Sequence, residues 1–357
     1  MTDTRTIRNR TRGGRVRMSA TTADLPTGPT EPGADGSARD MDVAAGLLAA
    51  ARSVVLVAHV HPDADALGSA LALGLGLARR GTQVKVSFAE PDTVPESLRH
   101  LPGMALVVDP DELVADGSDM FVSLDVGSRE RLGSLVRVLD ACPMSLVIDH
   151  HASNARFGRY NLIDVGAEAT AVLVARLLDR LGIPIDRDIA ENLYAGLATD
   201  TGHFRHADAD VHRLAARLID CGVRPVDVLH PITDSHPFGW LGMLSRVLDG
   251  AGLVPDAAGG GGLVYAIIDD AVRDGLRQEE LDSVIDILRT AQEAEVATVI
   301  KQTGPDAWQV SLRSRSSVDV AAAAAALGGG GHVRSAGFSH VGTAMQAVTR
   351  LCEVLDR

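Results

Sequence analysis

Three polar residues, Asp149, His150 and His151, directly follow the apolar run of residues 144–148. A short run of this kind, rich in β-branched side chains, predicts a buried strand. Placing a carboxylate and two imidazoles at its end is costly unless another group binds them. An Asp–His pair at a strand end could equally cap a neighbouring helix, and short motifs often match by chance. The tripeptide is therefore informative only together with other segments.

Carboxylates and imidazoles also follow two other predicted strands, residues 53–58 and 119–124. In an open α/β sheet, ligands bind at the carboxyl ends of the strands, so these segments should meet in one crevice. A further acid is expected to reach the crevice from a helix end. Together these candidates are His59, Asp63, Asp65, Asp125 and Asp200. Nearby, His61 and His203 are expected to be loop or packing residues.

This set of side chains suits divalent metal ions. It contains no thiolate, and carboxylate with imidazole favours Mn²⁺ or Mg²⁺ over structural zinc. With His150 the set suffices for two ions, which at a spacing of about 3.5 to 4 Å clamp both oxygens of a phosphoryl displacement. One carboxylate would then bridge the ions. We expect metal-dependent phosphoryl transfer.

A glycine run, Gly328 to Gly331, precedes His332 near the end of the chain. Glycines after a helix allow backbone N–H groups to approach an anion closely and form a nest, and Arg313 and Arg334 would add positive charge. The alternative is a flexible helix terminator. A second glycine run, 259–262, has no basic residue after it and is expected to be a hairpin loop.

Strands and helices alternate in the first part of the chain, which predicts an α/β fold with a parallel sheet and helices on both faces. The predicted strands are residues 53–58, 83–88, 105–108, 119–124 and 144–148. The predicted helices are residues 43–51, 68–80, 134–141, 167–181, 187–198 and 209–221.

The pattern weakens where three prolines, Pro225, Pro231 and Pro237, follow one another. We expect the inter-domain linker there. The rest predicts a smaller α/β domain with helices at 238–248, 278–288 and 318–327 and strands at 264–268, 295–301 and 308–313. Residues 1–41 are rich in Arg, Thr, Gly, Pro and Ser and predict a disordered tail. The expected organisation is a tail 1–41, a catalytic domain 42–222, a linker 223–237 and a second domain 238–357.

The composition limits the class of partner. A net charge of −13 disfavours a basic surface for long nucleic acid, whereas short anionic substrates remain possible because metal ions can supply positive charge. The three cysteines are far apart, which supports neither a disulfide framework nor a thiolate zinc site and predicts a reducing compartment. No apolar run reaches the roughly 18 to 20 residues that cross a bilayer. We expect a cytoplasmic protein without a membrane partner.

The order of these motifs resembles the DHH phosphoesterase superfamily over residues 51–204. The segments that carry the resemblance are His59-x-x-x-Asp63-x-Asp65, Asp125, Asp149-His150-His151 and Thr199-Asp200-Thr201-Gly202. Two later segments look like the DHH-associated C-terminal domain: Ser311-Leu312-Arg313-Ser314, and the glycine run with His332 and Ser335-Ala336-Gly337-Phe338. The arrangement is most similar to the NrnA-type group of nanoRNases, 3′-phosphoadenosine 5′-phosphate phosphatases and cyclic di-AMP phosphodiesterases.

The resemblance implies two Mn²⁺ ions, with Mg²⁺ or Co²⁺ as possible substitutes, and an active site in the cleft between the domains. The first ion would be held by His59, Asp63 and Asp125. The second would be held by Asp65, Asp125, His150 and Asp200, so that Asp125 bridges the ions. His151 would face the scissile phosphate, and Asp149 would orient an imidazole. Substrate binding would fall to Arg313, Ser314, Gly329, Gly330, Gly331 and His332.

The expected function is hydrolysis of short nucleotides by a hydroxide that the two ions generate from water. Candidate substrates are oligoribonucleotides of a few residues, 3′-phosphoadenosine 5′-phosphate, and cyclic or linear di-AMP, but not long duplexes. The resemblance also suggests a homodimer. One alternative is a RecJ-like single-strand exonuclease, which the acidic charge and the lack of an extra oligonucleotide-binding domain disfavour. The other is a non-catalytic nucleotide-binding regulatory module, which the complete ligand set disfavours.

Overall fold

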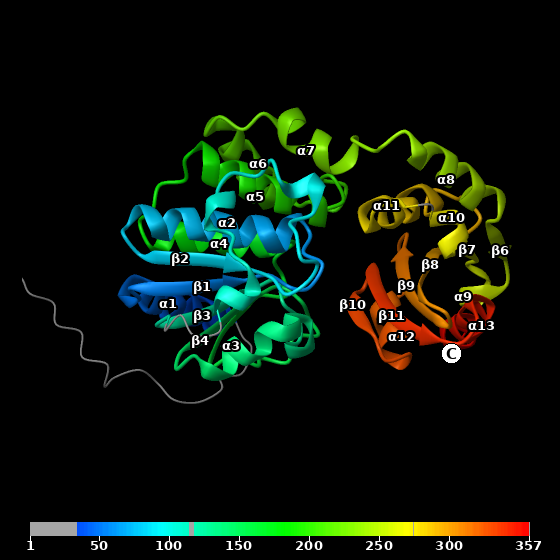
Figure 1. The fold of residues 1–357 in the computed structure, drawn as a ribbon, viewed down its shortest axis with the longest axis horizontal. Coiled ribbons are helices and arrows are strands. Elements are labelled where there is room, and N and C mark those ends of the chain that lie inside the picture. The colour runs from blue at the N-terminus through cyan, green and yellow to red at the C-terminus, as the bar shows by residue number, and fades with distance from the viewer. Residues whose placement is uncertain (1–33, 114–117, 274, 357) are drawn as a thin grey trace, which may run out of the picture.

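The N-terminal half of the chain folds around a five-stranded sheet in the order β2-β1-β3-β4-β5, and every neighbouring pair is parallel. The computed structural model describes residues 34–113, 118–273 and 275–356 (Figure 1). The strands are β1 (Ser53–Val57), β2 (Gln83–Ser87), β3 (Met120–Leu124), β4 (Ser145–Asp149) and β5 (Tyr160–Ile163). This sheet confirms the predicted α/β fold.

Helices cover both faces of the sheet, as β-branched strands buried on two sides require. On one face, the core includes Leu56, Val122 and Ile148 of the strands with α2, α4 and α5. On the other face, Val55, Val57 and Phe121 pack against the segment that contains α3. The helices of this unit are α1 (Ala34–Ala50), α2 (Ala64–Arg79), α3 (Val136–Ala141), α4 (Thr170–Arg180), α5 (Arg187–Asp200) and α6 (Ala209–Asp220).

The C-terminal unit is built on a six-stranded mixed sheet in the order β10-β11-β9-β8-β7-β6. One face packs against α8 and α11, and the other packs against α12 and α13. The strands are β6 (Gly252–Val254), β7 (Leu263–Ile268), β8 (Val296–Gly304), β9 (Ala307–Ser314), β10 (Gly330–His332) and β11 (Ser335–Val341). The helices are α8 (Gly239–Asp249), α9 (Ala257–Gly260), α10 (Asp270–Arg273), α11 (Gln278–Leu288), α12 (Val320–Ala326) and α13 (Ala344–Leu355).

Several predicted elements differ from the structure. The segment 105–108 was predicted as a strand, but a 3₁₀ turn at Met104–Leu106 and a single bridge between Val86 and Val107 take its place. Pairing with β2 is confined to that one bridge. The expected linker contains a helix, α7 (Pro225–Thr233). Pro225 is tolerated in its first turn, where the missing N–H has no partner to lose, and Pro231 lies inside the helix near its end.

The first helix also begins earlier than predicted, at Ala34, so the last part of the expected tail is helical. Met41 packs against the core, and Asp42 forms an ion pair with Arg180 of α4. The rest of that tail lies outside the described residues. The glycine run 259–262 closes the antiparallel turn between β6 and β7, as the predicted hairpin requires, with α9 inside the turn.

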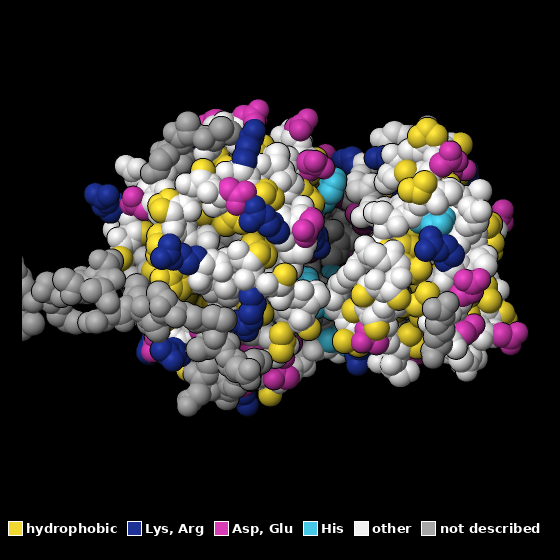
Figure 2. Space-filling view, turned by 90° about the horizontal axis from the view of Figure 1, so that it is seen from below, with side chains coloured by type: hydrophobic (Ala, Val, Ile, Leu, Met, Phe, Trp, Pro, Cys, Tyr) yellow, Lys and Arg dark blue, Asp and Glu magenta, His cyan; other side chains and the backbone are white. Residues whose placement is uncertain are grey.

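The two units touch at several points. Glu279 of α11 accepts hydrogen bonds from the backbone N–H groups of Glu96 and Ser97, each at 3.0 Å. Arg334, in the turn between β10 and β11, lies with its Nη1 2.9 Å from Nδ1 of His206. Figure 2 shows histidine side chains in the hollow between the units. Among the residues that the structure describes, no helix is both long and apolar enough to span a bilayer.

Candidate metal centre

The predicted ligands converge at one edge of the N-terminal sheet. β1, β3 and β4 are neighbours and parallel, so the residues that follow them share that edge. Asp200 joins them because it is the last residue of α5. Within the N-terminal unit, the side chains form groups whose potential ligand atoms all lie within 4.8 Å of one another. These groups are His59 with Asp63 and Asp125, Asp65 with His150 and Asp200, and Asp125 with Asp149 and His151.

The first group is built on the start of α2. Asp63 caps this helix, since its Oδ1 accepts hydrogen bonds from Asp65 N at 3.1 Å and Ala66 N at 3.0 Å. Its other oxygen, Oδ2, lies 3.7 Å from His59 Nε2, which in turn lies 3.6 Å from Asp125 Oδ2. The helix cap therefore fixes the carboxylate that faces His59.

The second group centres on His150. Its Nδ1 lies 3.0 Å from the carbonyl oxygen of Ala167, and donation to that oxygen leaves Nε2 without a proton in the neutral ring. Nε2 is buried without a hydrogen-bond partner, 3.4 Å from Asp125 Oδ1 and 3.2 Å from Asp200 Oδ2. A lone pair that faces two carboxylates is unfavourable unless a cation lies between them. The donor set therefore fits a divalent metal ion.

The protonation of His150 leads to the same conclusion. Burial lowers the pKa of His150, but its contacts with Asp125 and Asp200 outweigh burial and raise this pKa to about 12. Without a metal ion, the carboxylates thus draw a proton onto the ring. A divalent cation would meet the same demand for positive charge.

Asp65 is fully buried at the start of α2. Its oxygens accept hydrogen bonds from the first turn of α4, from Thr170 N at 2.6 Å and Ala171 N at 2.9 Å. A Cβ atom at Gly196 would lie 2.5 Å from Asp65 Oδ1, so only glycine allows α5 to pass this close. Burial and the charges of Asp200 and Asp125 raise the pKa of Asp65 well above its ordinary value. The clustered carboxylates repel one another in the absence of cations.

Asp125 lies between the two groups. Its Oδ2 faces His59, while its Oδ1 faces His150 and accepts a hydrogen bond from Thr170 Oγ1 at 2.9 Å. Although burial opposes ionisation, contacts with His150 and His59 hold the pKa of Asp125 well below its usual range. Its backbone has φ of +62°, in the left-handed region that non-glycine residues rarely adopt. The fold therefore holds this carboxylate between the two groups of candidate ligands.

Asp149 orients the second imidazole of the DHH segment. Its Oδ1 lies 2.7 Å from His151 Nδ1 and accepts the backbone N–H of His150 at 2.9 Å. Its Oδ2 accepts a hydrogen bond from Asn154 Nδ2 at 2.5 Å. Burial lowers the pKa of His151, but the hydrogen bond to Asp149 and the charge of Asp125 more than offset burial and raise it. Asp149 therefore fixes the orientation of the His151 ring and favours its protonated form.

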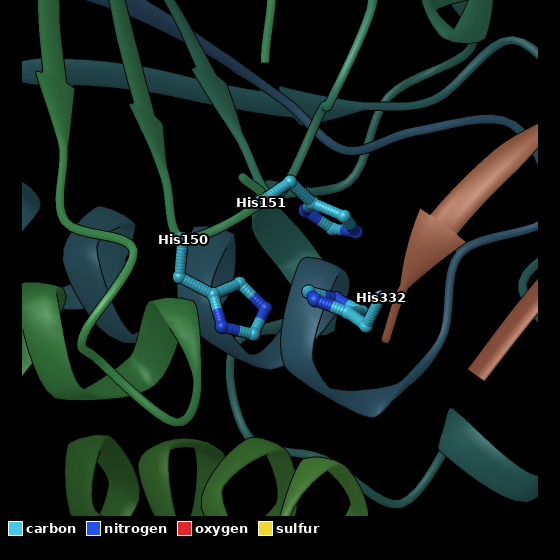
Figure 3. A group of neighbouring side chains, drawn as sticks. All are labelled: His150, His151 and His332. Carbon is cyan, nitrogen blue, oxygen red and sulfur yellow. The ribbon is translucent and has the colours of Figure 1, made fainter. Parts of the chain in front are cut away.

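A histidine of the C-terminal unit completes the cluster. The His332 ring stacks on His151 with centroids 4.1 Å apart and lies 4.7 Å from the His150 ring. Figure 3 shows the three rings facing one another, with His332 at the end of a C-terminal strand. Burial and the neighbouring imidazoles of His151 and His150 lower the pKa of His332 to about 4, so that it is neutral at physiological pH.

The other predicted substrate residues fall on two sides of the C-terminal sheet. Arg313 shares the face of His332, because ladder pairs join Arg313 to Ser335 and Ser335 to His332. Ser314 projects from the opposite face, where its Oγ donates to Glu295 at 3.2 Å. The structure therefore brings Arg313, but not the Ser314 hydroxyl, to the face that carries His332.

The glycine run does not form the open nest that the sequence suggested. Gly330 and Gly331 belong to β10, which pairs with β11. A Cβ atom at Gly329 would lie 2.1 Å from the carbonyl oxygen of Gly337, and one at Gly331 would lie 2.5 Å from that of Ser335. These two glycines permit close strand pairing, whereas Gly330 faces open space. Their main effect is to place His332 at the end of a strand.

Comparisons with known proteins agree with this arrangement. The DHH family N-terminal domain matches residues 53–197, and the DHHA1 domain matches residues 259–357. The bifunctional oligoribonuclease and PAP phosphatase NrnA of Thermus thermophilus is 33% identical over 311 residues, which cover 85% of this chain and 89% of that protein. The chain belongs to the DHH family. It is a hydrolase that acts on phosphoester bonds, and its family is metal-dependent.

Other similarities are more distant. The cyclic-di-AMP phosphodiesterase GdpP of Bacillus subtilis is 24% identical, over 85% of this chain and 47% of that protein. The crystal structure of an exopolyphosphatase-related protein from Bacteroides fragilis superimposes with a TM-score of 0.79 at 23% identity, covering 89% of this chain and 96% of that chain. This second likeness shows the shared fold alone.

Sequence reasoning missed some side chains around the DHH segment. Asn154 links Asp149 to the carbonyl oxygen of Val126, and Thr170 holds Asp125. Arg131 places its Nη2 2.9 Å from His59 Nδ1. An asparagine in the loop just after the motif was a usable signal, whereas Thr170 and Arg131 become visible only in three dimensions. His61 has a side chain 59% exposed beside Glu90, outside the groups described above.

Proposed function

We propose that this hydrolase is a Mn²⁺-dependent phosphoesterase that cleaves short nucleotides between its two units. The observation that carries the proposal is the stacking of His332 on His151. A side chain of the DHHA1 unit thereby forms one wall of the site at the DHH segment. The second unit would therefore limit how far a bound substrate can extend in that direction.

Two metal ions would complete the centre. His59, Asp63 and Asp125 would hold one ion, and the second would be held by Asp65, Asp125, His150 and Asp200. When bound, the ions would activate water and neutralise charge on the phosphate. The mixed carboxylate and imidazole donors support Mn²⁺, with Mg²⁺ or Co²⁺ as substitutes.

The chain's own groups would then orient the substrate. His151, aligned by Asp149, would donate a proton from Nε2 toward a phosphate oxygen. His332 and Arg313 would hold the nucleotide from the opposite wall, and contacts such as that of Arg334 with His206 would keep the units together. Closure of this kind excludes bulk water during reaction.

The substrates that we propose are oligoribonucleotides of a few residues, 3′-phosphoadenosine 5′-phosphate, and cyclic or linear di-AMP. The activities of the relatives from Thermus thermophilus, an oligoribonuclease and PAP phosphatase, and Bacillus subtilis, a cyclic-di-AMP phosphodiesterase, support this range. The net charge of −13 further disfavours long polyanions. A homodimer and a cytoplasmic location are part of the same proposal, and the three widely spaced cysteines offer no disulfide framework, in keeping with a reducing compartment.

One substrate panel with Mn²⁺ tests the proposal. It contains 3′-phosphoadenosine 5′-phosphate, linear di-AMP, cyclic di-AMP, a very short RNA and a long RNA. We expect turnover of at least one short nucleotide and little loss of the long RNA. Equal rates on the short and long RNA would contradict a size-limited site. Full activity in an Asp125→Ala variant would contradict the two-metal centre.

A further inference from the structure

Arg313 lies on the face of the C-terminal sheet that carries His332, and it has no carboxylate partner there. Its Nη1 donates to the carbonyl oxygen of Leu312 at 3.0 Å. Among the described residues, no carboxylate oxygen lies within 4.0 Å of its guanidinium. Burial lowers the pKa of Arg313, and the charges of Asp286 and Asp282 are the strongest opposing influence. Two acids therefore act on this side chain through their charge, yet neither contacts it.

Those two acids belong to α11, which covers the same face. Asp282 and Asp286 are one turn apart and so lie on one side of the helix. Ala297 and Val299 of β8 pack against α11, and they pair in the ladder with Arg313 and Ser311 of β9. Residues opposed in this way project from the same face. The geometry places the acids of α11 over the strand that carries Arg313.

Each acid is engaged by a different base. Lys301 Nζ contacts Asp282 Oδ1 and lies 3.0 Å from Ser311 Oγ, and Lys301 is only 2% exposed. Arg289 Nε donates to Asp286 Oδ1 at 2.8 Å. A buried ammonium needs a compensating carboxylate, so the Lys301 pair is held firmly. Both carboxylates are thereby paired with other bases rather than with Arg313.

We propose that Lys301 and Arg289 are positioning residues that keep Arg313 available for a substrate phosphate by engaging Asp282 and Asp286. The inference rests on the proposed function, in which Arg313 binds phosphate. A guanidinium forms strong two-point contacts with carboxylate and phosphate alike, so a released aspartate would compete directly with substrate. A base that holds each aspartate removes that competitor.

The first test compares Lys301→Gln with the double variant Lys301→Gln/Asp282→Asn. The measurement is the calorimetric affinity for adenosine 5′-monophosphate in the presence of Mn²⁺, together with kcat and KM for a short substrate. We expect Lys301→Gln to weaken nucleotide binding and raise KM about tenfold, the effect of one charge-assisted contact, with a smaller change in kcat. Removing the Asp282 charge as well should restore affinity to within about threefold of wild type.

Whether the double variant regains nucleotide affinity shows if Lys301 prevents competition by Asp282 or only supports the fold. If the double variant binds as weakly as Lys301→Gln, Lys301 merely supports the fold and the proposal is wrong. Arg289→Gln with Arg289→Gln/Asp286→Asn repeats the design at side chains that are 27% and 60% exposed, where substitution is tolerated by the fold. Arg180→Gln, which removes an ion pair with Asp42 in the other unit, should leave affinity unchanged.

The outcome also distinguishes this inference from the proposed function. The single variants could lose nucleotide affinity and the double variants regain it while the protein hydrolyses no short nucleotide. That result would contradict only the proposed function. Hydrolysis of short nucleotides with unchanged affinity in both single variants would contradict only the role of Lys301 and Arg289. A wild-type protein that does not bind adenosine 5′-monophosphate would contradict the inference, since Arg313 would then not hold a nucleotide phosphate.

Discussion

His151 and His332 stack with ring centroids 4.1 Å apart, although one ends the DHH segment and the other ends a strand of the second sheet. The contact ties the orientation of the His151 imidazole to the position of the C-terminal unit. A substrate phosphate at His151 would therefore meet groups from both units at once.

Replacing His332 should impair substrate binding without emptying the metal centre. Because His332 reaches the site from the second unit and contacts imidazole rings, His332→Ala should raise KM about tenfold. Steady-state kinetics and metal analysis of the same preparation check this. His230→Ala, at an exposed position on α7, serves as the control. Equal loss of metal and affinity would show that His332 is itself a ligand.

Replacing Asp149 should slow turnover with the metals still bound. Asp149→Asn removes the charge that aligns His151 Nδ1, and loss of such an orienting partner costs about 10- to 100-fold in activity. The measurement is kcat at saturating Mn²⁺ with metal content determined in parallel. Asn154→Ala, which leaves the Asp149 charge in place, should cost less. A larger effect of Asn154→Ala would mean that loop order, and not charge, controls His151.

Metal addition should stabilise the protein through the clustered carboxylates. The charges on Asp65, Asp125 and Asp200 repel one another, and ligand binding at 100 times its Kd adds about 2.7 kcal/mol to folding. Thermal unfolding with and without Mn²⁺ should show a higher Tm with metal. His150→Ala should lower the bound stoichiometry by about one ion and reduce the Tm increment. An unchanged stoichiometry would remove His150 from the ligand set.

Much of the N-terminal sheet and its acidic edge could be predicted from the sequence, because two-sided burial gives long apolar runs and the polar residues follow them directly. The strand β5 and the first turns of α1 lack such a run. The linker helix was hidden by its prolines. The pairing of β10 with β11 could not be predicted, because a glycine run is compatible both with an anion-binding nest and with two closely paired strands. Alternation along β9 already implied that Arg313 and Ser314 face opposite ways.

Acidification should loosen the contact between the units at His206. Burial and the charges of Arg334, Arg289 and Arg205 lower the pKa of His206, so a separated state binds protons more readily than the closed one. The closed contact is then complete above the ordinary pKa of about 6.5 and weakens as pH falls below it. Small-angle scattering at pH 8 and pH 5.5 should show expansion, and His206→Gln should reduce that difference. Equal expansion of both proteins would assign the effect to other groups.

The left-handed backbone of Asp125 has an evolutionary consequence. A residue held at φ +62° costs conformational energy that glycine would not incur. The aspartate is therefore kept for its carboxylate, which faces His59 and His150. Active members of the family should retain it, whereas lineages that lost catalysis should drift toward glycine at this position.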